Sequence, residues 1–175
     1  MLSIYNFNGK TMKKLVLLIG IFVFANTAQA DEKSDVAAVL DAFHVAAANA
    51  QAENYFDLFS EDAVFIGTDV GEYWTLEEFR AYAMPHFSAG NGWTYVPRNR
   101  DVYLSESGDV AWFHEVLDSE SYGTTRGTGV LVLEEGKNWK IAQYHLTFPV
   151  PNDMAKELSD KIKIYESQAG KKSPD

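Results

Sequence analysis

The second half of the chain carries four strand-like segments in succession, and this run constrains the fold more than any other feature. The segments cover about residues 93–104, 109–118, 124–134 and 139–148. Residues 135–138, Glu-Gly-Lys-Asn, are typical of a hairpin loop between the last two segments. Strands joined by short connections pair in antiparallel fashion. The run therefore predicts an antiparallel sheet built from consecutive segments of the chain.

Helical patterns precede this run. Apolar residues recur at helical spacing from Val36 to Ala47, which predicts a first helix. A short second helix is predicted at about residues 53–59, and the apolar run at 63–67 predicts a buried strand. Helices followed by strands predict an α+β fold, in which helices pack on one face of an antiparallel sheet.

Two further helices are indicated. Thr75 and Glu78 have the spacing of a capping box, so a helix is expected to begin there, and Pro85 is expected to end or kink it. The Asn-Asp pair at 152–153 can cap a last helix. Residues 154–175 are therefore expected to form a C-terminal helix followed by a disordered tail.

The N-terminus has the three parts of a secretory signal peptide. Lys13 and Lys14 precede ten apolar residues at 15–24, and an Ala-Gln-Ala sequence follows at 28–30. A membrane anchor is the alternative, but a spanning helix needs about 20 apolar residues. We expect residues 1–30 to be removed during export across the inner membrane, most simply into a bacterial periplasm.

Charge and composition exclude several classes of function. The net charge is −10, and removal of the three lysines of the N-terminal segment, which has no acidic residue, makes it −13. Such a chain should repel nucleic acid and anionic membrane surfaces. It has no cysteine and only four histidines, without H-x-H or HExxH spacing, so neither a disulfide nor a metal site is expected. It also lacks glycine-rich phosphate motifs, and no cofactor is expected.

Three segments together resemble the SnoaL-like branch of the NTF2-like superfamily. They are EDAVFIGTDVGEYWTLEEFRAY at 61–82, GDVAWFHE at 108–115 and NWKIAQYHLTFPVPND at 138–153. The resemblance implies that residues 31–153 form a cone, in which a curved sheet wraps on helices around a cavity. It also implies a homodimer through the convex sheet face. Functions in this superfamily range from cyclases and ketosteroid isomerase to binding domains, so the fold does not give the function.

The pairing of the last two strands determines which residues share a face. If the hairpin loop has two or four residues, His145 lies opposite Thr128, whereas a three-residue loop would shift the register by one. The predicted pairs are Arg126–Thr147, Thr128–His145, Val130–Gln143, Val132–Ile141 and Glu134–Trp139.

This register predicts a polar cluster on the concave face of the sheet. Arg126, Thr128, Gln143 and His145 would converge beside apolar residues, as in a small-molecule site. The opposite face would carry Tyr144, Leu146 and Phe148. That face is either a dimer patch or is covered by the C-terminal helix.

His145 has two interpretations. It is either a hydrogen-bonded structural residue or a pocket residue, and in the pocket it could act as general acid or base. Asp69 is either an auxiliary acid/base group or a turn-forming residue before Gly71. Tyr55, Trp74, Trp93 and Trp112 are expected in the core or in the cavity wall, and Tyr55, Trp74 and Trp112 are the candidate ligand-binding aromatics among them. His44 could face the core or the cavity.

The resemblance to ketosteroid isomerase does not extend to its catalytic groups. An ungapped comparison places its catalytic tyrosine at Phe43 and its catalytic aspartate at Gly67. Three hypotheses remain at this point. The first is an exported small-molecule-binding protein without established catalysis. The second is a cofactor-free isomerase, cyclase or hydratase that uses His145. The third is a structural or assembly domain.

Overall fold

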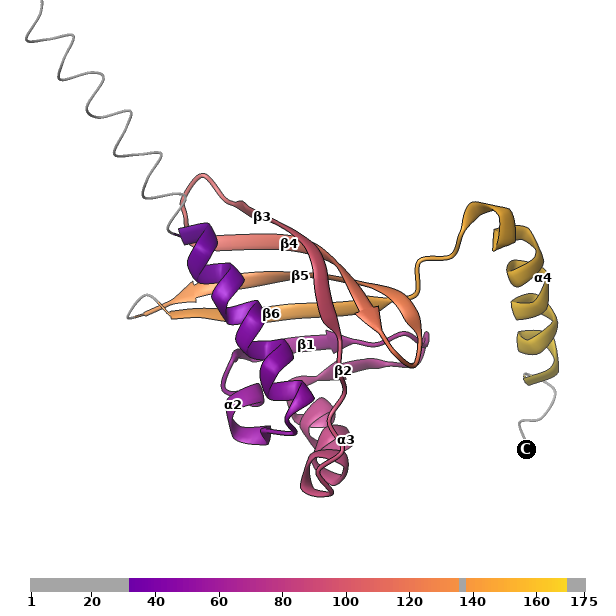
Figure 1. Ribbon diagram of the computed structural model, residues 1–175, viewed down its shortest axis with the longest axis horizontal. Coiled ribbons are helices and arrows are strands. Elements are labelled where there is room, and N and C mark those ends of the chain that lie inside the picture. Colours follow the sequence, from indigo (N-terminus) through magenta and orange to yellow (C-terminus); the bar gives the residue numbers. More distant parts are fainter. Residues whose placement is uncertain (1–31, 136–137, 170–175) are drawn as a thin grey trace, which may run out of the picture.

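The structure is a computed structural model that describes residues 32–135 and 138–169, and it is α+β (Figure 1). The predicted signal peptide and the predicted disordered tail lie outside the described residues. Among these residues no helix is long and apolar enough to cross a membrane. The chain forms a helix over residues 32–48 and then α2 (Ala52–Phe56), β1 (Phe59–Ile66), β2 (Tyr73–Thr75), α3 (Leu76–Ser88), β3 (Val96–Leu104), β4 (Val110–Ser119), β5 (Gly123–Glu134), β6 (Asn138–Thr147) and α4 (Asn152–Ala169).

The strands form one six-stranded sheet in the order β2-β1-β6-β5-β4-β3. All neighbouring strands are antiparallel except β1 and β6, which are parallel. The sheet curves around the first helix (Figure 1). The predicted fold class is therefore confirmed, and the C-terminal helix is present.

The first helix covers what we call the inner face of the sheet. Val36, Leu40, Phe43 and Ala47 are buried, at the three- and four-residue spacing that places them on one side of a helix. The ring of Phe43 lies 4.6 Å from that of Tyr144 on β6, measured between centroids. This contact joins the helix to the centre of the sheet.

Two local predictions need correction. The second helix ends at Phe56, and Phe59 already begins β1. Pro85 does not end α3, because the helix continues to Ser88. Proline lacks an N–H, which leaves the carbonyl of Ala81 without its helical donor. Ala81 and Pro85 are both exposed, so water can reach that carbonyl. The capping box of Thr75 and Glu78 is confirmed.

The β5–β6 hairpin contains the irregularity that decides which residues face inward. Glu134 pairs with Asn138, so the loop has three residues, and the predicted pairs Val132–Ile141 and Glu134–Trp139 are wrong by one position. A bulge then adds Ala142 between the Leu131–Ile141 and Val130–Gln143 pairs. Beyond the bulge, the predicted pairs Val130–Gln143, Thr128–His145 and Arg126–Thr147 are confirmed.

The bulge changes the alternation of side chains along β6. Trp139 and Ile141 are buried on the inner face, and so are Tyr144 and Leu146. The outer face is the opposite side of the sheet, and it carries Trp112, His114, Thr128 and His145 in cross-strand rows. Tyr144 and Leu146 therefore cannot form the predicted dimer patch.

The C-terminal helix does not cover the patch either. Helix α4 stands apart from the sheet after an extended link (Figure 1). Met154, Leu158, Ile162 and Tyr165 on its apolar side are all exposed. Tyr144 is covered by the first helix instead.

Candidate functional site: an aromatic cavity

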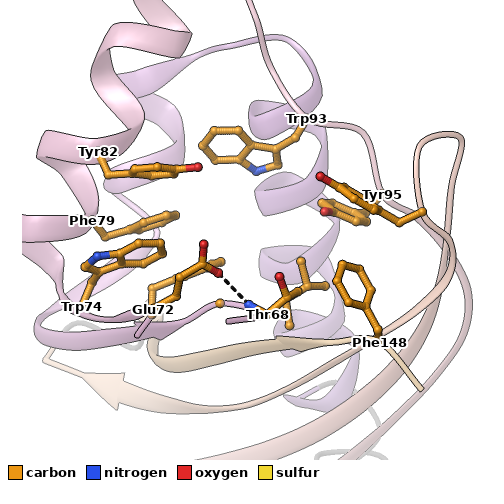
Figure 2. Close-up of a pocket in the computed structure, with 12 residues that line it drawn as sticks. Thr68, Glu72, Trp74, Phe79, Tyr82, Trp93, Tyr95 and Phe148 are labelled. Atoms are coloured by element: carbon orange, nitrogen blue, oxygen red, sulfur yellow. Dashed lines mark hydrogen bonds between the residues drawn. The ribbon is translucent and has the colours of Figure 1, made fainter. Parts of the chain in front are cut away.

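A cavity of about 240 Å³ opens at one end of the cone (Figure 2). Its wall comes from β1, the β1–β2 loop, β2, α3, the segment before β3, the β4–β5 turn and the end of β6. These segments meet because consecutive antiparallel strands bring alternate turns to the same end of a sheet. The lining residues are Phe65, Gly67, Thr68, Glu72, Trp74, Phe79, Tyr82, Trp93, Tyr95, Tyr122, Leu146 and Phe148.

Glu72 is the only charged residue among those that line the cavity. Its Oε2 accepts hydrogen bonds from the backbone N–H groups of Thr68, at 2.8 Å, and Asp69, at 3.1 Å. Gly67 makes this position possible, since a Cβ at residue 67 would lie 2.2 Å from Glu72 Oε2. The loop therefore fixes one carboxylate oxygen and points the group into the cavity.

Aromatic rings stack along one wall. Phe65 and Phe79 lie 3.9 Å apart and nearly parallel, Trp74 lies 5.8 Å from Phe79, and Tyr82 lies 4.9 Å from Trp74. On the opposite side Tyr95 and Phe148 face the same space (Figure 2). Partial burial, followed by the nearby hydroxyl of Tyr122 and the charge of Glu72, raises the pKa of Tyr95. That hydroxyl therefore remains a neutral donor.

This arrangement limits the chemistry of the cavity. Most of the wall is apolar and aromatic, and no arginine, lysine or histidine contributes to it. An anionic ligand would find no positive partner and would meet the charge of Glu72. The cavity can hold a small apolar or positively charged organic group, with a few polar contacts to orient it.

A second polar group lies deeper on the inner face, where Glu115 is fully buried. Its Oε1 accepts hydrogen bonds from the hydroxyl of Tyr144 at 2.9 Å and pairs with Nε2 of His44 at 2.8 Å. Arg100 donates to Oε2 at 2.8 Å and to the carboxylate of Asp41 at 2.7 Å.

Glycine on β5 makes room for this cluster. A Cβ at Gly127 would lie 2.3 Å from the Tyr144 hydroxyl and 2.9 Å from Glu115 Oε1. Burial by itself would raise the pKa of Glu115, but the hydrogen bonds and charges of His44 and Arg100 outweigh it, so the pKa is lowered. Burial and the adjacent carboxylate raise the pKa of Tyr144 well above its ordinary value. The Glu115 cluster is thus an ion-paired group within the core, and it lines no part of the cavity.

The polar cluster predicted from the last strand lies on the outer face. The prediction that this face is concave is wrong, because the bulge at Ala142 turns His145 away from the first helix. His145, Thr128 and Gln143 are half-buried there, and Arg126 is exposed. None of the four lines the cavity.

The four remaining predicted residues lie in four different places. Trp74 lines the cavity. Tyr55 is buried beneath it, with its ring 5.9 Å from that of Trp93. Trp112 lies on the outer face, 47% exposed, where it stacks on Tyr103. Asp69 is exposed, and its carboxylate accepts a hydrogen bond from the N–H of Gly71, as in a turn-forming aspartate.

Sequence reasoning missed Glu72 and the role of Glu115. Glu72 lies in a turn and has no motif around it. One available signal was the position of Trp93, Tyr95 and Phe148 at strand ends that antiparallel topology brings together. For His44 the sequence left two alternatives, the core and the cavity, and the structure shows that it faces the core.

The structure gives no support for a metal site. Within residues 32–135 and 138–169, no three histidine, aspartate or glutamate side chains come together in a way that could hold an ion.

The two positions compared with ketosteroid isomerase have structural roles. Phe43, at the position of the isomerase tyrosine, is buried in the core. Gly67, at the position of the isomerase aspartate, lies against the Glu72 carboxylate.

Several solved structures share this fold. An NTF2-like protein of unknown function from Pseudomonas putida is 16% identical, with a TM-score of 0.58 over 71% of this chain and 92% of that chain. A candidate dehydratase of the NTF2-like family from Streptomyces avermitilis is 14% identical, with a TM-score of 0.58 over 70% and 99%. A candidate ketosteroid isomerase from Shewanella frigidimarina is 20% identical, with a TM-score of 0.54 over 66% and 96%.

At these identities the likeness shows the fold alone. No curated protein has a significant sequence match to the chain. Residues 36–151, however, match the family described as the SnoaL-like domain. This match spans most of the first helix, the whole sheet and every element that lines the cavity. The chain therefore belongs to the SnoaL-like domain family, and it shares the fold of these NTF2-like structures.

Proposed function

We propose that the protein is an exported binding protein that takes a small, partly apolar organic molecule into the aromatic cavity. The observation that carries this proposal is the lining of the cavity, in which eight aromatic residues surround a single carboxylate. Pockets with mostly apolar walls and a few converging polar groups are the usual form of small-molecule sites. The sequence pattern of residues 1–30 supports export.

Binding can be tested with a fragment mixture and saturation-transfer NMR on the full chain. Thr68 lines the cavity with an exposed side chain, and its backbone N–H, which holds Glu72, is unchanged by substitution. Thr68→Phe should therefore fill the cavity and remove the signals of bound fragments. Ser159→Phe, on the separate helix α4, is the matched control and should bind as the wild type does. Equal binding by Thr68→Phe and the wild type would reject the cavity as the site.

A second candidate function is cofactor-free proton transfer, with Glu72 in place of His145 as the base. The observation in its favour is that the Glu72 carboxylate occupies the space that a side chain at residue 67 would take. Residue 67 is the position at which the comparison with ketosteroid isomerase places the catalytic aspartate. The test is the exchange of α-hydrogens of a cavity-bound ketone in D₂O. Exchange that is equally fast with the wild type and with Glu72→Gln would reject this function.

We also propose that the protein is a homodimer through the outer face. Tyr103 and Trp112 are 42% and 47% exposed on this face, with ring centroids 5.8 Å apart. Val116 and Val130 lie half-buried on the same face. Light scattering coupled to size exclusion should give twice the chain mass for the wild type and a monomer for Trp112→Glu. A wild-type monomer would reject the dimer.

A further inference from the structure

We propose that the cavity selects a small quaternary ammonium ion and that Glu72 is its counter-ion. This inference rests on the binding function proposed above and names the class of ligand. Four features of the cavity carry it: its charge, its rings, its polar partners and its size.

The charge of Glu72 has no positive partner in the described parts of the chain. None of the ion pairs formed by residues 32–135 and 138–169 includes Glu72. Its Oε2 is held by two backbone N–H groups, and no hydrogen bond within these residues uses Oε1. A carboxylate at a largely apolar wall is stabilised when a positive charge enters the same space. The site therefore favours a cationic ligand over a neutral one.

The rings provide the second attraction. A cation over the face of a tryptophan, tyrosine or phenylalanine is attracted by the electron density of the ring. Tyr82, Trp93, Tyr95 and Phe148 surround the space that the Glu72 carboxylate enters (Figure 2). They come from α3, the segment before β3 and the segment after β6, so a cation in the centre is approached from several sides. Cages of this kind are the known means of recognising quaternary ammonium groups.

The polar partners favour a quaternary over a primary ammonium ion. A primary ammonium group carries three N–H donors and a strongly held water shell. To replace that shell the cavity would have to direct three acceptors at one point, and Glu72 is its only charged acceptor. A quaternary ion has no N–H to satisfy, and its methyl groups match an aromatic wall.

The size of the cavity fits a small ion. A volume of 240 Å³ is below the range of about 300–1,000 Å³ for sites that hold drug-sized ligands. A trimethylammonium group with a short chain is of this order. The net charge of −10 also favours the approach of cations.

The test compares choline with 3,3-dimethylbutan-1-ol, in which a carbon atom replaces the charged nitrogen. Binding to the full chain is followed through the NMR signals of the tryptophan indoles, two of which, Trp74 and Trp93, line the cavity. Choline should bind at least tenfold more tightly than the alcohol. Glu72→Gln, which keeps the size of the side chain, should remove most of this difference. Glu106→Gln removes one charge at the exposed β3–β4 turn and should not change it.

Tyr82→Leu is an independent variant, because Tyr82 is 48% exposed and its loss should leave the fold intact. It should weaken choline and leave the alcohol unchanged. Equal binding of the two compounds would overturn the cation preference, and unchanged selectivity in Glu72→Gln would overturn the role of Glu72 as counter-ion. The binding function would stand in both cases. If neither compound binds and the fragments also fail to distinguish Thr68→Phe from the wild type, both proposals are overturned.

Discussion

The inner side of the cone holds two carboxylates in opposite situations. Glu115 is fully buried and is bound on both oxygens by His44, Tyr144 and Arg100. Glu72 lies at the cavity wall and is bound on one oxygen by two amides of its own loop. The partners of Glu115 are distant in sequence, whereas those of Glu72 are three and four residues away.

This difference separates a group that holds the fold together from one that is available to a ligand. A fully buried carboxylate that is bound on both oxygens by other side chains is out of reach of a ligand. Its removal leaves other charges without a partner. A carboxylate with an unused oxygen can receive a ligand, and its removal should cost the fold little. Substitutions at the two carboxylates and at their neighbours test this separation.

Removal of Glu115 should have the largest effect on stability. In Glu115→Ala, Arg100 and His44 lose a buried partner, and such a loss costs about 3–5 kcal/mol in the free energy of unfolding. Glu72→Ala should cost about 1 kcal/mol, since only the hydrogen bonds of an accessible loop are lost. Urea unfolding followed by circular dichroism measures both. Similar losses in the two variants would show that Glu72 is also a structural residue.

Acid should destabilise the protein through Glu115. Its pKa in the folded state lies below the ordinary value of 4.5. The stabilisation is therefore complete above pH 4.5 and is lost as the pH falls from there through the lowered folded-state pKa. The free energy of unfolding of the wild type should fall more steeply below pH 4.5 than that of Glu115→Gln. Parallel curves would mean that other carboxylates cause the acid sensitivity.

The hydroxyl of Tyr144 should contribute a smaller amount. Tyr144→Phe removes one donor to Glu115, and hydrogen bonds to charged groups contribute about 1.5–3 kcal/mol. Tyr82→Phe is the matched control at the cavity wall, where the hydroxyl is accessible to water, and should change stability by less than about 0.5 kcal/mol. Thermal unfolding of the two variants checks this. Equal effects would contradict a special role for the Glu115 cluster.

The local part of the fold could be predicted from the sequence. The first helix and the capping box at Thr75 follow from periodicity and side-chain chemistry. The three predicted pairs around Thr128–His145 are correct only because the bulge at Ala142 offsets the three-residue loop, which by itself shifts the pairing by one position. The sequence could not show which side chains of β6 face inward. Before the bulge the odd-numbered residues Trp139 and Ile141 face inward, and after it the even-numbered residues Tyr144 and Leu146 do, because Ala142 is an extra residue in the strand. Nothing about an alanine between two strand residues indicates a bulge.

The two carboxylates were harder to predict for a different reason. Glu115 is recognisable only through His44, which is 71 residues away in sequence. Glu72 depends on Gly67, because any side chain there would exclude the carboxylate. The contacts of Glu115 form only when the first helix packs on the sheet, whereas those of Glu72 depend on the conformation of the β1–β2 loop. Residue types alone pointed to His145, because histidine is the usual acid or base.

His145→Ala should have the smallest effect. It tests directly whether only the inner face of β6 acts on the cavity. His145 and Leu146 are adjacent in sequence but lie on opposite faces of β6. His145→Ala should leave choline binding unchanged, whereas Leu146→Ala should weaken it because Leu146 lines the cavity. Leu146→Ala should also cost about 2–5 kcal/mol in stability, as a large-to-small change at a buried site does. The NMR titration of choline measures binding in both variants. A loss of binding in His145→Ala as large as that in Glu72→Gln would mean that the outer face acts on the cavity. In that case the division between a structural and a ligand-facing carboxylate would not be sufficient, because a half-buried imidazole on the far side of the sheet would control the site.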